Sequence, residues 1–171
     1  MNIFLLVLIA VFSFVPGMLQ PFTESAQEET VATNRVADQL AKGLLGDPAT
    51  PYVLDTECTA DFFAGANNPA CRYGPGSLAD RVGIQSRQNV NISVRANVSE
   101  TQSDGKDVLC WDEGPSPNQL IELDDGCSPG AADQTVLAIG NTTARGSAQS
   151  VTASRIVALN GTDVTLRVEM W

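Results

Sequence analysis

The residues best suited to chemistry in this sequence are carboxylates, because the chain of 171 residues contains no histidine. The Ser-His-Asp and Cys-His arrangements that activate a nucleophile are therefore excluded. Two acidic pairs, Asp112-Glu113 and Asp124-Asp125, could supply an acid and a base or oxygen ligands for calcium. Adjacent side chains seldom converge on one site, so solvated acidic loops are the favoured interpretation. We expect no catalytic residue, no metal site and no cofactor.

The four cysteines are better explained as disulfide partners than as zinc ligands. Cys58, Cys71, Cys110 and Cys127 are widely spaced, whereas zinc sites usually take two ligands from one tight turn. Of the three possible pairings, the order along the chain favours Cys58 with Cys71 and Cys110 with Cys127. A reducing cytoplasm would not keep such bonds, so we expect the body of the chain to be extracellular.

Four asparagines stand in N-x-Ser/Thr sequons: Asn91, Asn97, Asn141 and Asn160. The alternating pattern of NVNISVRANVS places Asn91 and Asn97 on the outward face of a strand. Asn141 falls in an expected loop, and Asn160 falls at the tip of an expected hairpin. A glycan could project into water from each position, so we expect at least one to be glycosylated. Ordinary polar strand and turn residues are the alternative.

The charge of the chain excludes several classes of partner. There are 20 Asp and Glu residues against 10 Lys and Arg residues, and the net charge is −10. Nucleic acid and anionic lipid surfaces are bound through clustered basic residues, and no such cluster is visible. An acidic surface stays hydrated in strong salt, where charge repulsion is screened. We therefore expect a halophilic protein, with an ordinary acidic exported protein as the alternative.

The N-terminal sequence is apolar enough to enter a membrane. From Ile3 to Val15 only Ser13 interrupts the apolar run, and its continuation to Leu19 gives the length that crosses a bilayer core. No lysine or arginine precedes the run and no A-x-A-like site follows it, which disfavours a cleaved signal peptide. We expect residues 1–22 to form a transmembrane helix.

Residues 23–47 are expected to continue as an amphipathic helix towards the head of the protein. Ser25 and Glu28 have the spacing of a capping box, and the sequence GDP at residues 46–48 is a strong stop. Apolar side chains recur near one helical face at Val31, Val36, Leu40 and Leu44. This face should lie on a globular domain.

Beyond residue 48 the pattern changes to that of β-strands. Residues 90–98 alternate apolar and polar side chains, and Asn160-Gly161 between two alternating runs predicts a hairpin. A short helix is expected from Ser77, because Ser77 and Asp80 have capping spacing ahead of Val82. Further strands are expected at residues 108–111, 119–123 and 135–139. The predicted fold class is α+β: a long N-terminal transmembrane and amphipathic helix followed by a mostly antiparallel β head domain with disulfides over residues 48–171.

The order of these features, with the segments FVPGMLQPFTE and RVADQLAKGLLGDPATPYVLDTEC, resembles an uncharacterised haloarchaeal family of exported, membrane-anchored proteins that are type IV pilin-like. The resemblance covers the first part of the chain, up to Cys58, and its motifs are not catalytic. It implies an N-terminal helix that packs against copies of itself in a filament core. The basic leader, the peptidase site and the early acidic residue of pilin precursors are not found before Ile3. The alternatives are therefore a true start upstream of Met1 and a simple membrane anchor.

Together these features predict a non-enzymatic cell-surface protein, a pilin-like or minor pilus subunit anchored by its N-terminal helix. Its expected location is the cell membrane, with the head domain outside, and a cell-surface filament is the alternative. Its expected partners are the membrane and other pilin-like subunits, including copies of itself, and no nucleic acid. The alternatives are a solitary membrane-anchored binding module and, less favoured, a carboxylate-based hydrolase or ion-binding domain.

Overall fold

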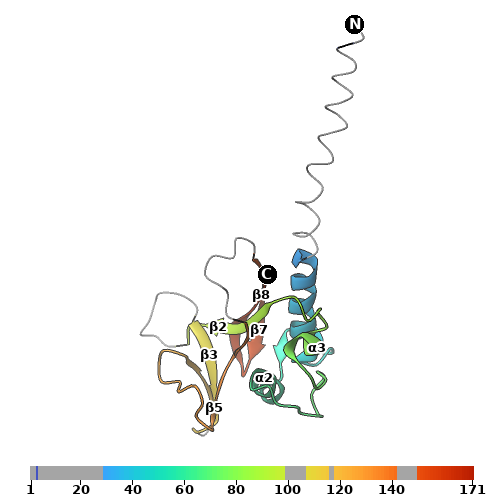
Figure 1. Cartoon of the computed structure of the whole chain (residues 1–171). Coiled ribbons are helices and arrows are strands. Elements are labelled where there is room, and N and C mark those ends of the chain that lie inside the picture. The colour runs from blue at the N-terminus through green and yellow to red at the C-terminus, as the bar shows by residue number, and fades with distance from the viewer. Residues whose placement is uncertain (1–2, 4–28, 99–106, 116–117, 142–149) are drawn as a thin grey trace.

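The computed structural model describes residue 3 and residues 29–98, 107–115, 118–141 and 150–171. Within these ranges, eight strands form a mixed sheet in the order β1-β7-β8-β2-β3-β4, with β5 beside β3 and β6 beside β2 (Figure 1). The strands are β1 (Val53–Leu54), β2 (Val90–Ala96), β3 (Asp107–Asp112), β4 (Gln119–Glu122), β5 (Gln134–Val136), β6 (Ala138–Gly140), β7 (Val151–Leu159) and β8 (Thr162–Met170). Only the β1–β7 pairing is parallel among these strands.

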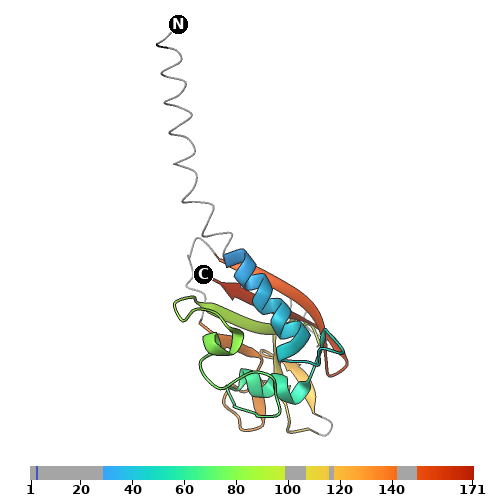
Figure 2. The ribbon, with the colours of Figure 1, turned by 90° about the vertical axis from the view of Figure 1, so that its right-hand side faces the viewer.

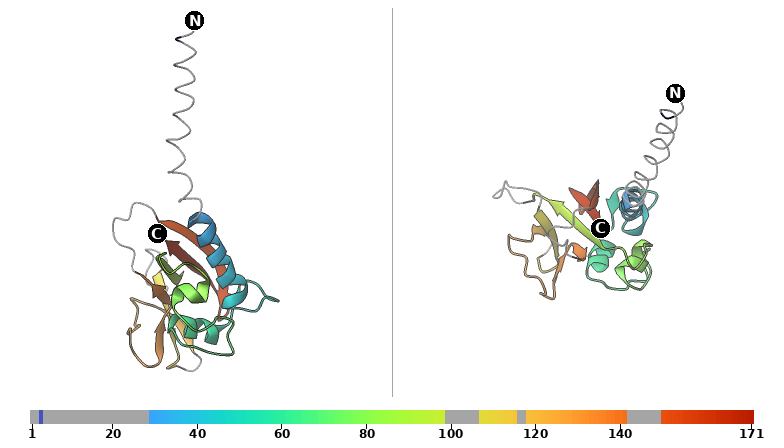
Figure 3. Two further views of the ribbon diagram at one scale, coloured as in Figure 1. Left: turned by 45° about the vertical axis from the view of Figure 1, so that its right-hand side comes forward. Right: turned by 45° about the horizontal axis from the view of Figure 1, so that its top comes forward.

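The helical segments lie together on one side of the sheet (Figures 2 and 3). A helix over residues 29–39 continues into a π-helical turn at Leu40–Leu44, and the two together are called the long helix below. Two shorter helices follow, α2 (Thr56–Phe63) and α3 (Leu78–Val82).

The β7–β8 hairpin forms the middle of the sheet. Its two nine-residue strands are paired without interruption from Leu159–Thr162 to Val151–Met170. Asn160 and Gly161 connect them with φ values of 51° and 76°, and two positive φ values are the requirement of the tight type I′ hairpin turn. The predicted hairpin is confirmed. The predicted apolar face of β8 is also buried, at Val164, Leu166, Val168 and Met170.

The outer edge of β2 is shared by two strands. β6 pairs with β2 from Asn91 to Ser93, and β3 pairs with it at Arg95 and Ala96. Leu137 fills the point where they diverge: its N–H donates to the Leu109 carbonyl, and its carbonyl accepts from the Val94 N–H, both at 2.8 Å. The single strand expected at residues 135–139 is therefore split into β5 and β6.

The long helix contributes one wall of the hydrophobic core. Val36, Ala37, Leu40 and Ala41 are at most 1% exposed and join the buried face of the sheet. Val31, expected on the same face, is 69% exposed. It precedes Val36 by five residues, which places it about 140° away from Val36 around the helix axis. Thr33 takes the inward position instead, and its hydroxyl donates to the Glu29 carbonyl at 2.6 Å.

The predicted fold class is therefore wrong. The structure is mostly a mixed eight-stranded sheet with few helices, and β1 makes it mixed by pairing in parallel with β7. The long helix is built into the core rather than leading to it, because the sheet covers its apolar stripe. No helix within the described ranges is long and apolar enough to cross a membrane. The span predicted for residues 1–22 and the capping box at Ser25 lie outside those ranges.

Candidate functional site

The structure does not gather the predicted carboxylates into a reactive centre. Asp112, at the end of β3, is 9% exposed, and its Oδ1 accepts from the Gly114 N–H at 3.0 Å. Glu113 is exposed, as are Asp124 and Asp125 in the turn after β4. In the part of the chain that the structure describes, no group of three or more acidic or cysteine side chains could hold a metal ion. The role visible for Asp112 is to fix the backbone of its turn.

All four cysteines form disulfides in the predicted pairing. Cys58 is bonded to Cys71, with Cα atoms 5.5 Å apart, and Cys110 to Cys127, with Cα atoms 6.2 Å apart. The first bond ties α2 to the loop before α3, and the second ties β3 to the segment after β4. The first closed segment contains most of α2, and the second contains the end of β3 and all of β4.

The four sequon asparagines differ in accessibility. Asn160 is exposed at the tip of the hairpin, and Asn97 is exposed just after β2. Asn91 is half-buried, and its side-chain amide donates to the Asn141 carbonyl at 3.1 Å. The amide of Asn141 in turn donates to the side chain of Asn89. Glycosylation of these residues stays a prediction, with Asn97 and Asn160 the less encumbered sites.

A groove that the sequence did not predict runs between the long helix and α3. Its first part is a cavity of about 470 Å³ between residues 31–36 and the loop at residues 83–88. A second cavity of about 490 Å³ lies between residues 38–44 and residues 80–83. Both are lined by Gly83, so they adjoin. We call them together the helix–α3 groove, and Figure 3 shows the two helices that flank it.

Local hydrogen bonds fix the α3 wall of the groove. Ser77 and Asp80 form the capping box expected at the start of α3, and Gly83 ends the helix with φ of 67°. The hydrogen bonds from Ser77 hold the pKa of Asp80 below its usual value. Arg81 donates from Nη2 to the Gly65 carbonyl at 2.8 Å and from Nε to the Gly76 carbonyl at 3.3 Å. Arg81 therefore holds α3 to two positions of the preceding chain, Gly65 and Gly76.

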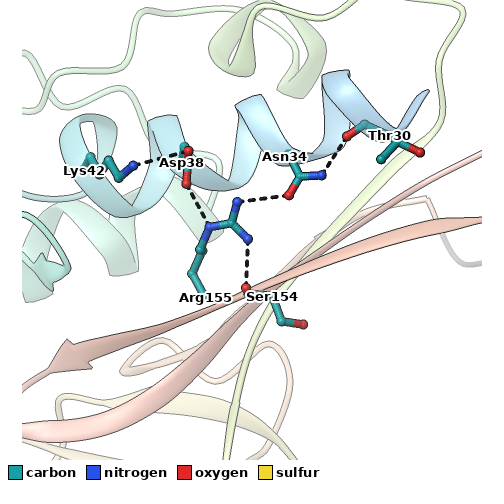
Figure 4. A network of polar contacts seen from close by, with 6 residues as sticks. All are labelled: Thr30, Asn34, Asp38, Lys42, Ser154 and Arg155. Atoms are coloured by element: carbon teal, nitrogen blue, oxygen red, sulfur yellow. Dashed lines mark hydrogen bonds and ion pairs between the residues drawn. The ribbon is translucent and has the colours of Figure 1, made fainter. Parts of the chain in front are cut away.

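A polar network fixes the opposite wall, the long helix, to the sheet (Figure 4). Arg155 of β7 donates from Nε to Asp38 Oδ1 at 2.8 Å and from Nη2 to Asn34 Oδ1 at 3.0 Å. Lys42 lies 3.3 Å from the other Asp38 oxygen and 5.5 Å from the centre of the Tyr52 ring. The hydrogen bond from Arg155 is the main cause that lowers the pKa of Asp38. Sequence reasoning missed this network, because its members are far apart along the chain.

The two parts of the groove differ in charge. No carboxylate lines the first cavity, whose one charged residue is Arg35. A Cβ atom placed on Gly83 would lie 3.9 Å from Arg35 Nη2, so the guanidinium lies beside Gly83 at the junction of the two cavities. In the second cavity, Asp38 and Asp80 are both engaged in the local contacts described above. The exposed guanidinium of Arg35 makes no ion pair with any described residue.

A comparison with protein families places the whole chain in one group. One family model matches residues 1–171. The chain belongs to a family of unknown function (DUF7287). No curated protein and no solved structure matched the chain. Membership of DUF7287 names neither a pilin nor a source organism, so the resemblance to haloarchaeal pilin-like proteins stays a prediction.

Proposed function

We propose that the chain is a non-enzymatic cell-surface protein whose disulfide-bonded sheet domain lies outside the cytoplasm. The observation that carries the proposal is the pair of disulfides, Cys58–Cys71 and Cys110–Cys127. Disulfides persist in oxidising compartments and are rare where thiols are kept reduced. The apolar sequence of residues 3–19 supports attachment to a membrane. The net charge of −10 suits a salt-rich exterior and argues against a nucleic-acid partner.

Composition supports a role in binding or assembly rather than in catalysis. The chain has no histidine, the side chain that most often transfers protons near neutral pH. Of the exposed predicted carboxylates, Glu113 directly follows β3, and Asp124 and Asp125 lie in the turn after β4. Their pattern is that of solvated acidic surface.

Thiol accessibility in intact cells tests the location. Cells producing the chain are reduced mildly and then treated with a membrane-impermeant maleimide of high mass, with and without lysis. The expected result is labelling of the cysteines before lysis, because the domain faces outwards. A cytoplasmic protein with exposed thiols serves as the control and should be labelled only after lysis. Labelling of the chain only after lysis would overturn the proposal.

Two forms of this function differ in partner. In one, the chain is a pilin-like or minor pilus subunit that assembles with its own kind; in the other, it is a solitary binding module. The helix–α3 groove favours the second form, because cavities of about 300–1,000 Å³ are typical of ligand sites. Electron microscopy of cells with and without the gene separates them. Loss of surface filaments on deletion would favour the subunit.

A further inference from the structure

The shape of the helix–α3 groove suits an extended chain. From Val31 to Gly43 it follows twelve residues of helix, which corresponds to about 18 Å at the helical rise per residue. An extended segment of about five residues covers the same distance at about 3.3 Å per residue. Gly43 and Gly83 contribute no side chains, and a Cβ atom on Gly43 would meet nothing within 4 Å. The groove is therefore open at Gly43, whereas the Arg35 guanidinium lies beside Gly83.

The chemistry of the groove suits an occupant with both apolar and acidic side chains. Val31 is 69% exposed at its rim, and Ala32 and Ile84 are half-buried along its wall. Arg35 is the one charged residue of the first cavity, and no described residue forms an ion pair with it. In a protein of net charge −10, this is a place where an incoming carboxylate would meet a positive charge that no described residue neutralises in an ion pair.

We propose that the helix–α3 groove binds a short extended segment of a partner protein, in which apolar side chains flank an acidic one that pairs with Arg35. The apolar side chains would cover Val31 and Ile84, and the carboxylate would accept hydrogen bonds from the guanidinium. The proposal names the partner for the binding-module form of the proposed function. It rests on that function in one respect: the groove must face the outside of the cell to meet an extracellular partner.

Selection from a displayed library of random seven-residue peptides tests the proposal directly. The full chain, with its disulfides intact, is immobilised in detergent-containing buffer at about 0.1 M salt, where the Debye length is about 10 Å. Peptides are selected on the unaltered chain alone, so that dependence on Arg35 is not imposed by the selection. Individual peptides are then measured by fluorescence anisotropy. The matched control is Arg87→Gln, because Arg87 is an exposed arginine of the same loop region that does not line either cavity.

A second variant fills the groove without touching its charge. Gly43→Leu places a side chain in the open space of the second cavity. Thermal unfolding shows whether Gly43→Leu folds, and Gly43→Gln is used in its place if it does not. The expected result is a selected set that combines acidic and apolar residues. Its affinity should fall about tenfold or more in Arg35→Gln, as expected when a charge-assisted hydrogen bond is lost, and also in the filled variant, but not in Arg87→Gln.

Several results would overturn the proposal. They are failure to enrich any peptide, enrichment of basic or uncharged peptides, and peptides whose affinity is insensitive to Arg35→Gln. An Arg35-dependent dimer in light scattering would assign the groove to a second copy instead. Because these measurements use purified protein, their failure leaves the cell-surface location to be judged by thiol labelling alone.

Discussion

Arg155 Nε lies 2.8 Å from Asp38 Oδ1 and joins the β7 strand to the long helix across 117 positions of sequence. The same guanidinium donates from Nη1 to the Ser154 carbonyl at 2.9 Å. β1 pairs with β7 only at Ala158 and Leu159, so Ser154 lies in the part of β7 that β1 does not reach. Arg155 therefore contacts the long helix and also donates to a β7 carbonyl beyond the β1 pairing. One side chain therefore connects the helix wall of the groove to the sheet.

Replacing Arg155 should loosen the long helix. Arg155→Gln removes an ion pair with Asp38 and a hydrogen bond to Asn34, and we expect the free energy of unfolding to fall by about 1–2 kcal/mol. Urea denaturation at neutral pH measures the change. The control, Arg87→Gln, alters an exposed arginine and should change stability by less than about 0.5 kcal/mol. An Arg155 variant as stable as the control would contradict a structural role for the network.

The Arg155–Asp38 contact should also depend on pH. The fold lowers the pKa of Asp38, mainly through the hydrogen bond from Arg155. A lowered pKa means that the contribution to stability is present above the unfolded value of about 3.9 and is lost as pH falls through the folded value. The side chain of Asp38 is 42% exposed, so we expect less than about 1 kcal/mol. The stability difference between the unaltered chain and Asp38→Asn, measured by urea at pH 6 and pH 3, should shrink towards acid; a constant difference would argue against this assignment.

Two glycines three residues apart should respond in opposite directions to alanine. A Cβ atom on Gly46 would clash with the carbonyl oxygen of Val53, so Gly46→Ala should cost about 1–3 kcal/mol of unfolding free energy. Gly43 has open space around it in the helical turn, so Gly43→Ala should stabilise the protein by about 0.5–1 kcal/mol. Thermal and chemical unfolding of both variants check the pair. Equal effects would mean that the close approach of Gly46 to β1 does not exist.

Each disulfide should contribute comparably to stability. The sequence separations are 13 and 17 residues, for which the loop-entropy description gives about 3 kcal/mol per bond. The double variants Cys58→Ala/Cys71→Ala and Cys110→Ala/Cys127→Ala should each lose about this amount. Calorimetry with and without dithiothreitol supplies the internal control, since reduction should destabilise the unaltered chain more than either double variant. A reductant-insensitive melting temperature in the unaltered chain would rule the prediction out.

Glycan occupancy should follow exposure. Asn97 and Asn160 are exposed, whereas Asn91 is half-buried and its amide is engaged with the Asn141 carbonyl. A glycan on Asn91 would have to displace that hydrogen bond. Glycopeptide mass spectrometry of protein from its natural source should therefore find more glycan on Asn97 and Asn160 than on Asn91. Higher occupancy at Asn91, or unmodified asparagine at all four sequons, would contradict the expectation.

Local chemistry determined what could be predicted from the sequence. Asn160-Gly161 predicted the β7–β8 turn, because few residue pairs accept two positive φ values. Ser77 and Asp80 predicted the start of α3, because the capping box is formed within one helical turn. The order of the cysteines predicted the disulfides, since each pair closes a short loop. A signal for α2 was present but overlooked: Asp55 precedes the helix, and its carboxylate accepts from the Cys58 N–H at 2.8 Å.

Tertiary contacts decided the rest. Three features join segments that local sequence patterns cannot connect. They are the parallel pairing of β1 with β7, the break between β5 and β6 at Leu137, and the contact of Arg155 with Asp38. The groove is of the same kind, since its walls come from the long helix, which Arg155 holds to the sheet, and from α3, which Arg81 holds to the loop before it. The apolar pattern of the sequence thus indicated which side chains would be buried, whereas the packing of distant segments determined which residues each of them contacts.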